Sequence, residues 1–330
     1  MKWKKFLPII GISLFIYILI KLNILEVFNK IGGLDLTYFL LAVSFVIIIL
    51  TTQTLKWFVI AKIQKISIPF RDAFRINLIS NFYGIITPSK LGTVVRANYL
   101  KKYIGNMGKG ISNFVLDKLL DVSSVLFIAI IFSMIFQKKF SIISIPLSII
   151  IFILIVALMI FFIDKKRSKS LLRVVYIKLI PKKVKERARL TFHSFYEDMP
   201  KKRNFLFFFI MNLLNWLAIY ILVFLIGNSL GVDIKLIHFL AILPIGTLVA
   251  FIPITLSGIG TRDLVWLTLF GKFGIDGATI ISMSLLTLFL TGIVPAAIGG
   301  LVILFERVKS RKTRNRLVQL EENVNYVKYF

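Results

Sequence analysis

The sequence predicts an all-α, polytopic integral membrane protein with about six full spans and two broken re-entrant hairpins. The chain has 330 residues, 58% of them hydrophobic, and its mean hydropathy is +0.87. Several apolar runs reach about 20 residues, the length that an α-helix needs to cross a bilayer. Two other apolar segments are interrupted by proline, serine and glycine, which predicts broken helices inside protein or beside a wet cavity.

The first two spans follow from the N-terminus, which we place in the cytoplasm. Lysines precede the first apolar segment, 6–20, and put its start on the inner side. Residues 21–36 carry acidic and basic side chains and are expected to form a neutral outer loop. Residues 37–60 return inward, and Lys56 is close enough to the end of this span to snorkel to the inner surface.

The first interrupted segment, 73–105, is predicted to enter and leave the membrane on the cytoplasmic side. The apolar part before Pro88 is too short to cross the membrane. Basic residues lie on either side of the segment, which places both of its ends in the cytoplasm. The next spans, 111–136 and 142–163, are joined by a short outer turn. The chain is therefore expected to be cytoplasmic again after residue 163.

The stretch 164–203 is strongly basic and is placed in the cytoplasm. Apolar residues at helical spacing within it allow two interpretations, a helix lying on the anionic inner leaflet or a solvated basic linker. Both interpretations keep this loop out of the hydrocarbon core.

The second half is expected to repeat the pattern of the first. Residues 204–226 cross outward, and the second interrupted segment, 236–270, enters from the outer side and returns to it. Residues 277–305 cross inward, and 306–330 form a basic cytoplasmic tail. The two hairpins are thus a predicted inverted repeat within one membrane domain, 1–305.

The amino-acid composition argues against several classes of function, including metal-dependent, cofactor-dependent and nucleic-acid-binding proteins. The absence of cysteine excludes disulfides and thiolate chemistry, and the two histidines lie far apart, so we expect no metal site and no cofactor. The net charge of +27 could indicate nucleic-acid binding, but the basic residues gather in the predicted inner segments. We therefore expect a multi-pass protein of the cell membrane whose partners are lipids, not nucleic acid. It could also form a homo-oligomer or act with a lipid-modifying enzyme.

The two interruptions, 85–96 and 248–263, share an order of residues. In each, a proline is followed by a serine, a glycine and then an arginine eight or nine residues beyond the proline. Broken segments at corresponding places in two halves are typical of a transporter's substrate site. The residues predicted to form a headgroup-binding site are Asn77, Asn81, Pro88, Gly92, Arg96, Ser257, Gly258, Gly260 and Arg262.

Arg96 and Arg262 are the leading candidates for contact with substrate. A guanidinium beside free backbone N–H groups suits a phosphate, and an ionisable group at membrane depth requires a function or a partner. The alternative for Arg262 is structural, either an ion pair with Asp263 or a salt bridge to Asp117 or Asp121.

A polar stripe marks the third span. Asn113, Asp117 and Asp121 recur every four residues and share one helix face. Lys118 is spaced to pair with Asp121. We interpret Asp117, Lys118 and Asp121, together with Asp263, as charge braces. The alternative is Mg²⁺ binding, because the spacing resembles the diphosphate motif of intramembrane prenyltransferases, whose second aspartate-rich motif is absent.

These motifs together resemble the lysylphosphatidylglycerol synthase/flippase transmembrane family. The resemblance rests on the stretches 81–96, 117–121 and 257–263 and covers nearly the whole chain in order. It implies a membrane domain that moves lipids with modified polar headgroups between leaflets. The positions that match the family's motifs are Pro88, Gly92, Arg96, Asp121, Gly258, Gly260 and Arg262.

The sequence departs from the family pattern in ways that concern the substrate more than the fold. Thr93 and Asp263 stand where the family often has glutamate, and Asp117 and Lys118 stand where it has Glu-Arg. An arginine common in the last span is missing from 277–305. Because only about 25 residues follow that span, we expect no aminoacyl-transfer domain and no lysyltransferase activity.

We therefore expect a flippase or transporter that moves an anionic or modified polar-headgroup lipid, a phospholipid or a polyprenyl-phosphate-linked lipid. The alternative function is a membrane-embedded transferase that acts on a polyprenyl phosphate or diphosphate. The short predicted outer loops and the lack of a paired acid and base favour transport without covalent chemistry.

Overall fold

The computed structural model describes residues 24–87, 89–105, 107–135, 197–201, 203–252 and 257–306, with the single positions Tyr17, Ile20, Ile153, Ser194, Thr255 and Val308. Apart from these single positions and Glu306, the predicted spans 6–20 and 142–163 and the tail lie outside the described residues, as does the greater part of the basic loop.

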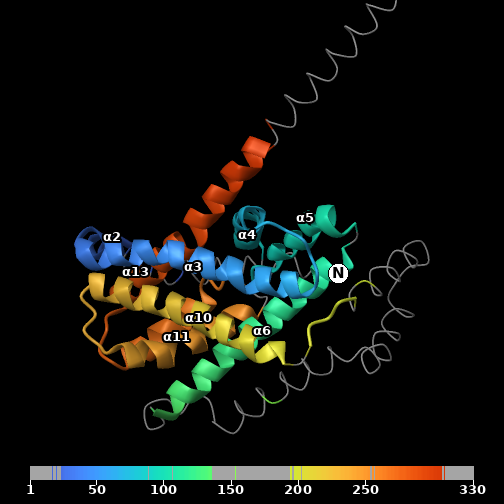
Figure 1. The fold of residues 1–330 in the computed structure, drawn as a ribbon. Coiled ribbons are helices and arrows are strands. Elements are labelled where there is room, and N and C mark those ends of the chain that lie inside the picture. The colour runs from blue at the N-terminus through green and yellow to red at the C-terminus, as the bar shows by residue number, and fades with distance from the viewer. Residues whose placement is uncertain are drawn as a thin grey trace, which may run out of the picture.

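The described part of the chain is helical (Figure 1). In chain order its elements are α2 (Ile24–Gly32), α3 (Leu36–Ile63), α4 (Phe70–Ile85), a 3₁₀ turn (Leu91–Val94), α5 (Val95–Ile104), α6 (Gly108–Ile135), α10 (Asn204–Ser229), α11 (Leu236–Phe251), α12 (Thr261–Gly271) and α13 (Gly277–Leu288). A π-helical turn, Phe289–Ile293, continues α13 into one helix that reaches Glu306.

Three helices among the described residues are long and apolar enough to cross a membrane, namely Leu36–Ile63, Asn204–Ser229 and Gly277–Glu306. The helix α6 is as long as α3, at 28 residues, but carries the charged residues of the polar stripe in its middle. The protein is thus an α-helical membrane protein, and the long helix α6 carries charged residues in its middle.

The helices α3 and α10 run side by side through the bundle, and α6 crosses them obliquely (Figure 1). Their apolar faces meet those of α11 and α13 in the main core, which includes Ile49, Val223, Leu243 and Met283. A hydrogen bond of 3.0 Å from Thr52 Oγ1 to the Asn215 side chain also joins α3 to α10. The core therefore holds together helices from both halves of the chain.

The segment 21–36 was predicted to be a loop, and this prediction was wrong because it contains α2. The helix buries Val27 against Ala278 and Ile281 of α13, packs Ile31 against the same cluster and exposes most of its other side chains. A helix of nine residues is too short to register as a span, although its apolar residues lie on one face.

In each interrupted segment two short helices flank the break, and their ends away from the break contact each other. In the first pair, the Tyr103 hydroxyl at the end of α5 donates a 2.6 Å hydrogen bond to Asp72 at the start of α4. In the second pair, the His238 ring near the start of α11 packs 4.8 Å from the Phe273 ring just after α12.

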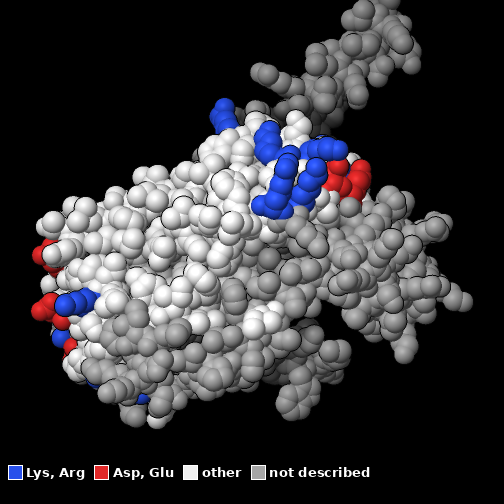
Figure 2. Space-filling model, turned by 60° about the horizontal axis from the view of Figure 1, so that its bottom comes forward, with Lys and Arg blue, Asp and Glu red and all other residues white. Residues whose placement is uncertain are grey.

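Charged side chains on the described surface gather at its two ends, with a broad uncharged region between them (Figure 2). Lys30 and Asp276 form an ion pair of 3.3 Å beside α2 and α13. Another ionic group contains Asp198, whose carboxylate lies 2.8 Å from Lys109 and 2.7 Å from Lys65. Exposed apolar residues occupy the helix surfaces, as expected for lipid-facing positions.

Candidate functional site

The first break lies between α4 and α5, where the chain makes a tight turn. Ser89 and Lys90 both adopt left-handed backbone conformations, with φ of 49° and 55°. The Gly92 N–H then donates a 2.7 Å hydrogen bond to Thr87 Oγ1. A Cβ on Gly92 would overlap the carbonyl oxygen of Tyr83, so only glycine fits against the last turn of α4. The predicted site residue Pro88 lies outside the described residues.

The second break lies between α11 and α12 and uses similar geometry. Ser257, Gly258 and Gly260 have φ of 50°, 81° and 85°. A Cβ on Gly258 would lie 2.5 Å from the Ala250 Cβ. The Asp263 carboxylate accepts a 2.8 Å hydrogen bond from the Gly260 N–H and thereby caps the start of α12.

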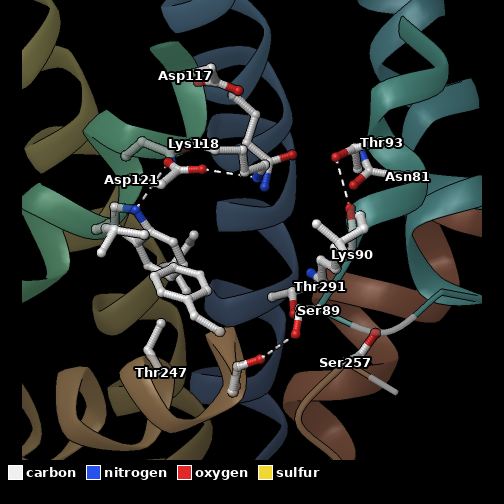
Figure 3. A pocket seen from close by; sticks show the side chains of 18 of the residues that line it. Asn81, Ser89, Lys90, Thr93, Asp117, Lys118, Asp121, Thr247, Ser257 and Thr291 are labelled. Atoms are coloured by element: carbon white, nitrogen blue, oxygen red, sulfur yellow. Dashed lines mark hydrogen bonds and ion pairs between the residues drawn. The ribbon is translucent and has the colours of Figure 1, made fainter. Parts of the chain in front are cut away.

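The two breaks meet directly. The Ser89 hydroxyl donates a 3.2 Å hydrogen bond to the carbonyl of Ala250 at the end of α11 (Figure 3). Beside this contact lies a cavity of about 430 Å³ that both halves of the chain line. The predicted residues on its wall are Asn77, Asn81, Arg96, Asp117, Lys118, Asp121, Ser257 and Arg262. The other described predicted residues, Gly92, Gly258, Gly260 and Asp263, do not line it.

Lys56 lies deep in the bundle, and the prediction that it snorkels to the inner surface was wrong. Its side chain is 6% exposed, and its ammonium contacts both Asp121 and, at 3.0 Å, Asp117 of α6. It also donates a 3.1 Å hydrogen bond to Asn212 of α10. Because two carboxylates of α6 compensate the charge of the Lys56 ammonium inside the bundle, this side chain need not reach water.

The same two carboxylates bind two further cations. Arg96 donates a 3.0 Å hydrogen bond to Asp117, and its guanidinium lies 4.8 Å from the Trp57 ring. Lys118 forms the expected pair with Asp121, at 3.0 Å. This arrangement disfavours the Mg²⁺ interpretation, because ammonium and guanidinium groups already occupy the carboxylate oxygens.

Arg262 forms the local ion pair of the structural alternative, at 3.2 Å from Asp263, rather than a salt bridge to α6. Its guanidinium also donates to the Ser284 hydroxyl of α13 and lies 4.5 Å from the Trp266 ring. The side chain is 12% exposed and still lines the cavity. Both arginines therefore extend from the second helix of a broken pair, bond to the long helix that follows and pack on a tryptophan.

Comparison with known proteins identifies the family. The model of the lysylphosphatidylglycerol synthase TM region matches residues 7–299. The chain belongs to this family. A UPF0104 membrane protein of Pyrococcus horikoshii is 24% identical over 326 residues, which cover 92% of this chain and 97% of that protein. A UPF0104 membrane protein of Methanothermobacter thermautotrophicus is 24% identical over 270 residues, covering 76% of this chain and 80% of the relative.

Two cationic residues line the cavity of this member of the lysylphosphatidylglycerol synthase transmembrane family without having been predicted as site residues, Lys56 and Lys90. The signal for Lys90 was its place inside the first break, directly after Ser89. The signal for Lys56 was a lysine within an apolar span, with two aspartates in the next predicted full span. Neither pattern predicts which charged side chains form ion pairs, because the pairing depends on how α3, α6 and the two breaks pack together.

Proposed function

We propose that this chain is a lipid flippase or transporter that moves an anionic or modified polar-headgroup lipid between the leaflets of the cell membrane. The observation that carries the proposal is the cavity where the two helix breaks meet, which is rich in cations and lies within a bundle that contains long apolar helices. A polar cavity of this kind inside a bundle offers a headgroup a path that the hydrocarbon core denies it.

The contacts at the ends of the bundle support the predicted inverted repeat. Asp276, at the start of α13, pairs with Lys30 near the ends of the second hairpin. Glu306, at the far end of the same helix, pairs with Arg75 at the base of the first hairpin. A helix of 30 residues is about 45 Å long. The hairpins then open toward opposite ends, as alternating access between two sides requires.

In this proposal Arg96 and Arg262 bind the headgroup from opposite sides. Asn77, Asn81 and Ser257 line the same cavity and supply further polar groups. Trp216, whose indole N–H donates to Asp121, and Tyr220 also lie on its wall, where their rings can flank the apolar part of a lipid.

The test is leaflet exchange by the purified protein in liposomes that contain fluorescent phosphatidylglycerol. Dithionite bleaches only the outer-leaflet label in protein-free vesicles, and the proposal predicts that bleaching extends to the inner-leaflet label when protein is present. The transferase alternative is tested in parallel with polyprenyl phosphate and Mg²⁺. Mg²⁺-dependent product formation without lipid exchange would replace the proposed function with the alternative.

A further inference from the structure

The cavity and the residues bonded to its wall carry more positive than negative charge. Among the described residues, the cations are Lys56, Lys90, Arg96, Lys118 and Arg262, and the carboxylates bonded to them are Asp117, Asp121 and Asp263. Five cations and three carboxylates leave an excess of two positive charges. One excess charge belongs to the shared network on α6, and the other belongs to Lys90.

Lys90 differs from the other cations because its ammonium has no ion-pair partner within the described part of the chain. It stands in the turn of the first break and lines the cavity with Ser89 and Ser257 (Figure 3). Lys118 and Arg262 are close enough to repel its charge, and Asp121 attracts it. An uncompensated ammonium within the bundle is unfavourable unless a ligand supplies the negative charge.

The hydroxyl of Ser257 is a second, independent observation that points to a ligand with hydrogen-bond acceptors. It is buried and has no hydrogen-bond partner among the described residues. A buried donor without a partner lowers stability, and native proteins usually satisfy it with protein, water or ligand. Lys90 and Ser257 thus bring an unpaired charge and an unpaired hydroxyl to one cavity from the two different breaks.

An oxyanion with several oxygens would satisfy both groups, and a phosphate offers them in charge-assisted hydrogen bonds. Much of the wall is apolar and includes Leu119, Val122, Ile219, Val223 and Phe251. This surface suits the hydrocarbon or glycerol part of a lipid and gives a free phosphate ion nothing to contact. A headgroup with net positive charge would instead meet the uncompensated cations.

We propose that the cavity selects lipids whose phosphate headgroup is net negative, that Lys90 and Ser257 bind this phosphate together with Arg96 and Arg262, and that lipids with a net positive, aminoacylated headgroup are rejected. This selectivity rests on the proposed lipid transport and names its substrate class. Rejection follows from like-charge repulsion at low dielectric, which is a stronger discriminator than the loss of one contact.

The test measures binding to the full-length protein in neutral detergent by calorimetric titration. The probes are short-chain phosphatidic acid, phosphatidylglycerol, phosphatidylcholine and lysylphosphatidylglycerol, with inorganic phosphate as the free anion. We expect the two anionic lipids to bind at least tenfold more tightly than phosphatidylcholine, and lysylphosphatidylglycerol to bind more weakly still. Equal or tighter binding of lysylphosphatidylglycerol would overturn the inference, and inorganic phosphate binding as tightly as phosphatidic acid would make the ligand a free anion.

Variants at Lys90 separate ligand binding from folding. Lys90→Gln should weaken binding of phosphatidic acid at least tenfold, because one charge-assisted hydrogen bond is lost, and Lys90→Arg should retain most of it. Lys101→Gln, at an exposed position on α5, is the matched control and should bind normally. Because Lys90→Gln removes an unpaired charge, its Tm without ligand should equal or exceed that of the wild type, whereas the increase in Tm with phosphatidic acid should shrink. Unchanged binding by Lys90→Gln would overturn the role of Lys90.

Exchange in liposomes distinguishes this inference from the proposed function. Exchange of anionic and aminoacylated lipids at equal rates would overturn the selectivity and leave the flippase intact. Selective binding without exchange of any probe would support the headgroup site and contradict transport.

Discussion

Lys56 on α3 and Asp117 on α6 lie 3.0 Å apart, and both side chains are almost completely buried. With Asp121, Arg96 and Lys118 they form a network that joins two long helices to the first broken pair. Buried ion pairs of this kind contribute little net stability when intact, but loss of one partner leaves an uncompensated charge. Substitutions of different members of the network should therefore lower the stability of the protein by different amounts.

Asp121→Asn should be more destabilising than Lys56→Met. The first change leaves three cations with one carboxylate, and we expect a loss of about 3 to 5 kcal/mol. The second leaves two balanced pairs, Arg96 with Asp117 and Lys118 with Asp121, so its loss should be smaller. Thermal unfolding in detergent measures both, with Lys62→Met at an exposed position of α3 as control. An Asp121→Asn variant as stable as the wild type would show that the network carries no such imbalance.

Variants at Arg262 distinguish a role in headgroup binding from a purely structural ion pair with Asp263. Arg262→Gln should slow lipid exchange roughly 10- to 150-fold, the effect of about 1.5 to 3 kcal/mol from hydrogen bonds to a charged group. Asp263→Asn in the same chain should not restore exchange, although it removes the unpaired carboxylate and should recover stability. If the double variant regains both stability and exchange, Arg262 is only a partner for Asp263.

The glycines of the breaks should resist substitution. Gly92→Ala crowds the Tyr83 carbonyl, and Gly260→Ala places a side chain at φ of 85°, which is unfavourable by about 1 to 3 kcal/mol. Both should lower Tm, and Gly92→Leu and Gly260→Leu should stop exchange. Gly271→Ala is the control, because a Cβ there meets nothing within 4 Å. Equal Tm values for the three alanine variants would mean that the breaks tolerate ordinary helix geometry.

The topology can be read from single cysteines, because the natural chain has none. Cysteines near Lys62, Lys183 and Arg314 should react with an impermeant reagent from the cytoplasm, and those near Lys30 and Lys138 from outside. The described contacts already separate Lys30, beside the second hairpin, from Lys65, which follows α3. Labelling of the Lys183 position from outside would contradict the predicted inverted hairpins.

Sequence reasoning predicted the elements more fully than the contacts between them. Hydrophobic length predicted a span at 204–226, and the structure has α10 at Asn204–Ser229. The glycines located both breaks, because glycine acts on the backbone locally. The partners of Lys56 could not be predicted, because its pairing depends on the approach of α3 to α6. The environment of Lys90 could not be predicted either: it has no ion-pair partner among the described residues because its turn faces a cavity, and sequence spacing does not reveal this. The amphipathic helix α2 was not predicted, because its nine residues are too few for a span and the charged residues around it are typical of a loop.

Leaflet exchange of fluorescent phosphatidylglycerol by Arg96→Gln, beside the wild type in matched liposomes, tests the central claim most directly. Asp117 keeps Lys56 as its partner in this variant, so the protein should fold. The account predicts that Arg96→Gln has nearly wild-type Tm and exchanges lipid roughly 10- to 150-fold more slowly. Exchange at the wild-type rate by a stably folded Arg96→Gln variant would contradict it.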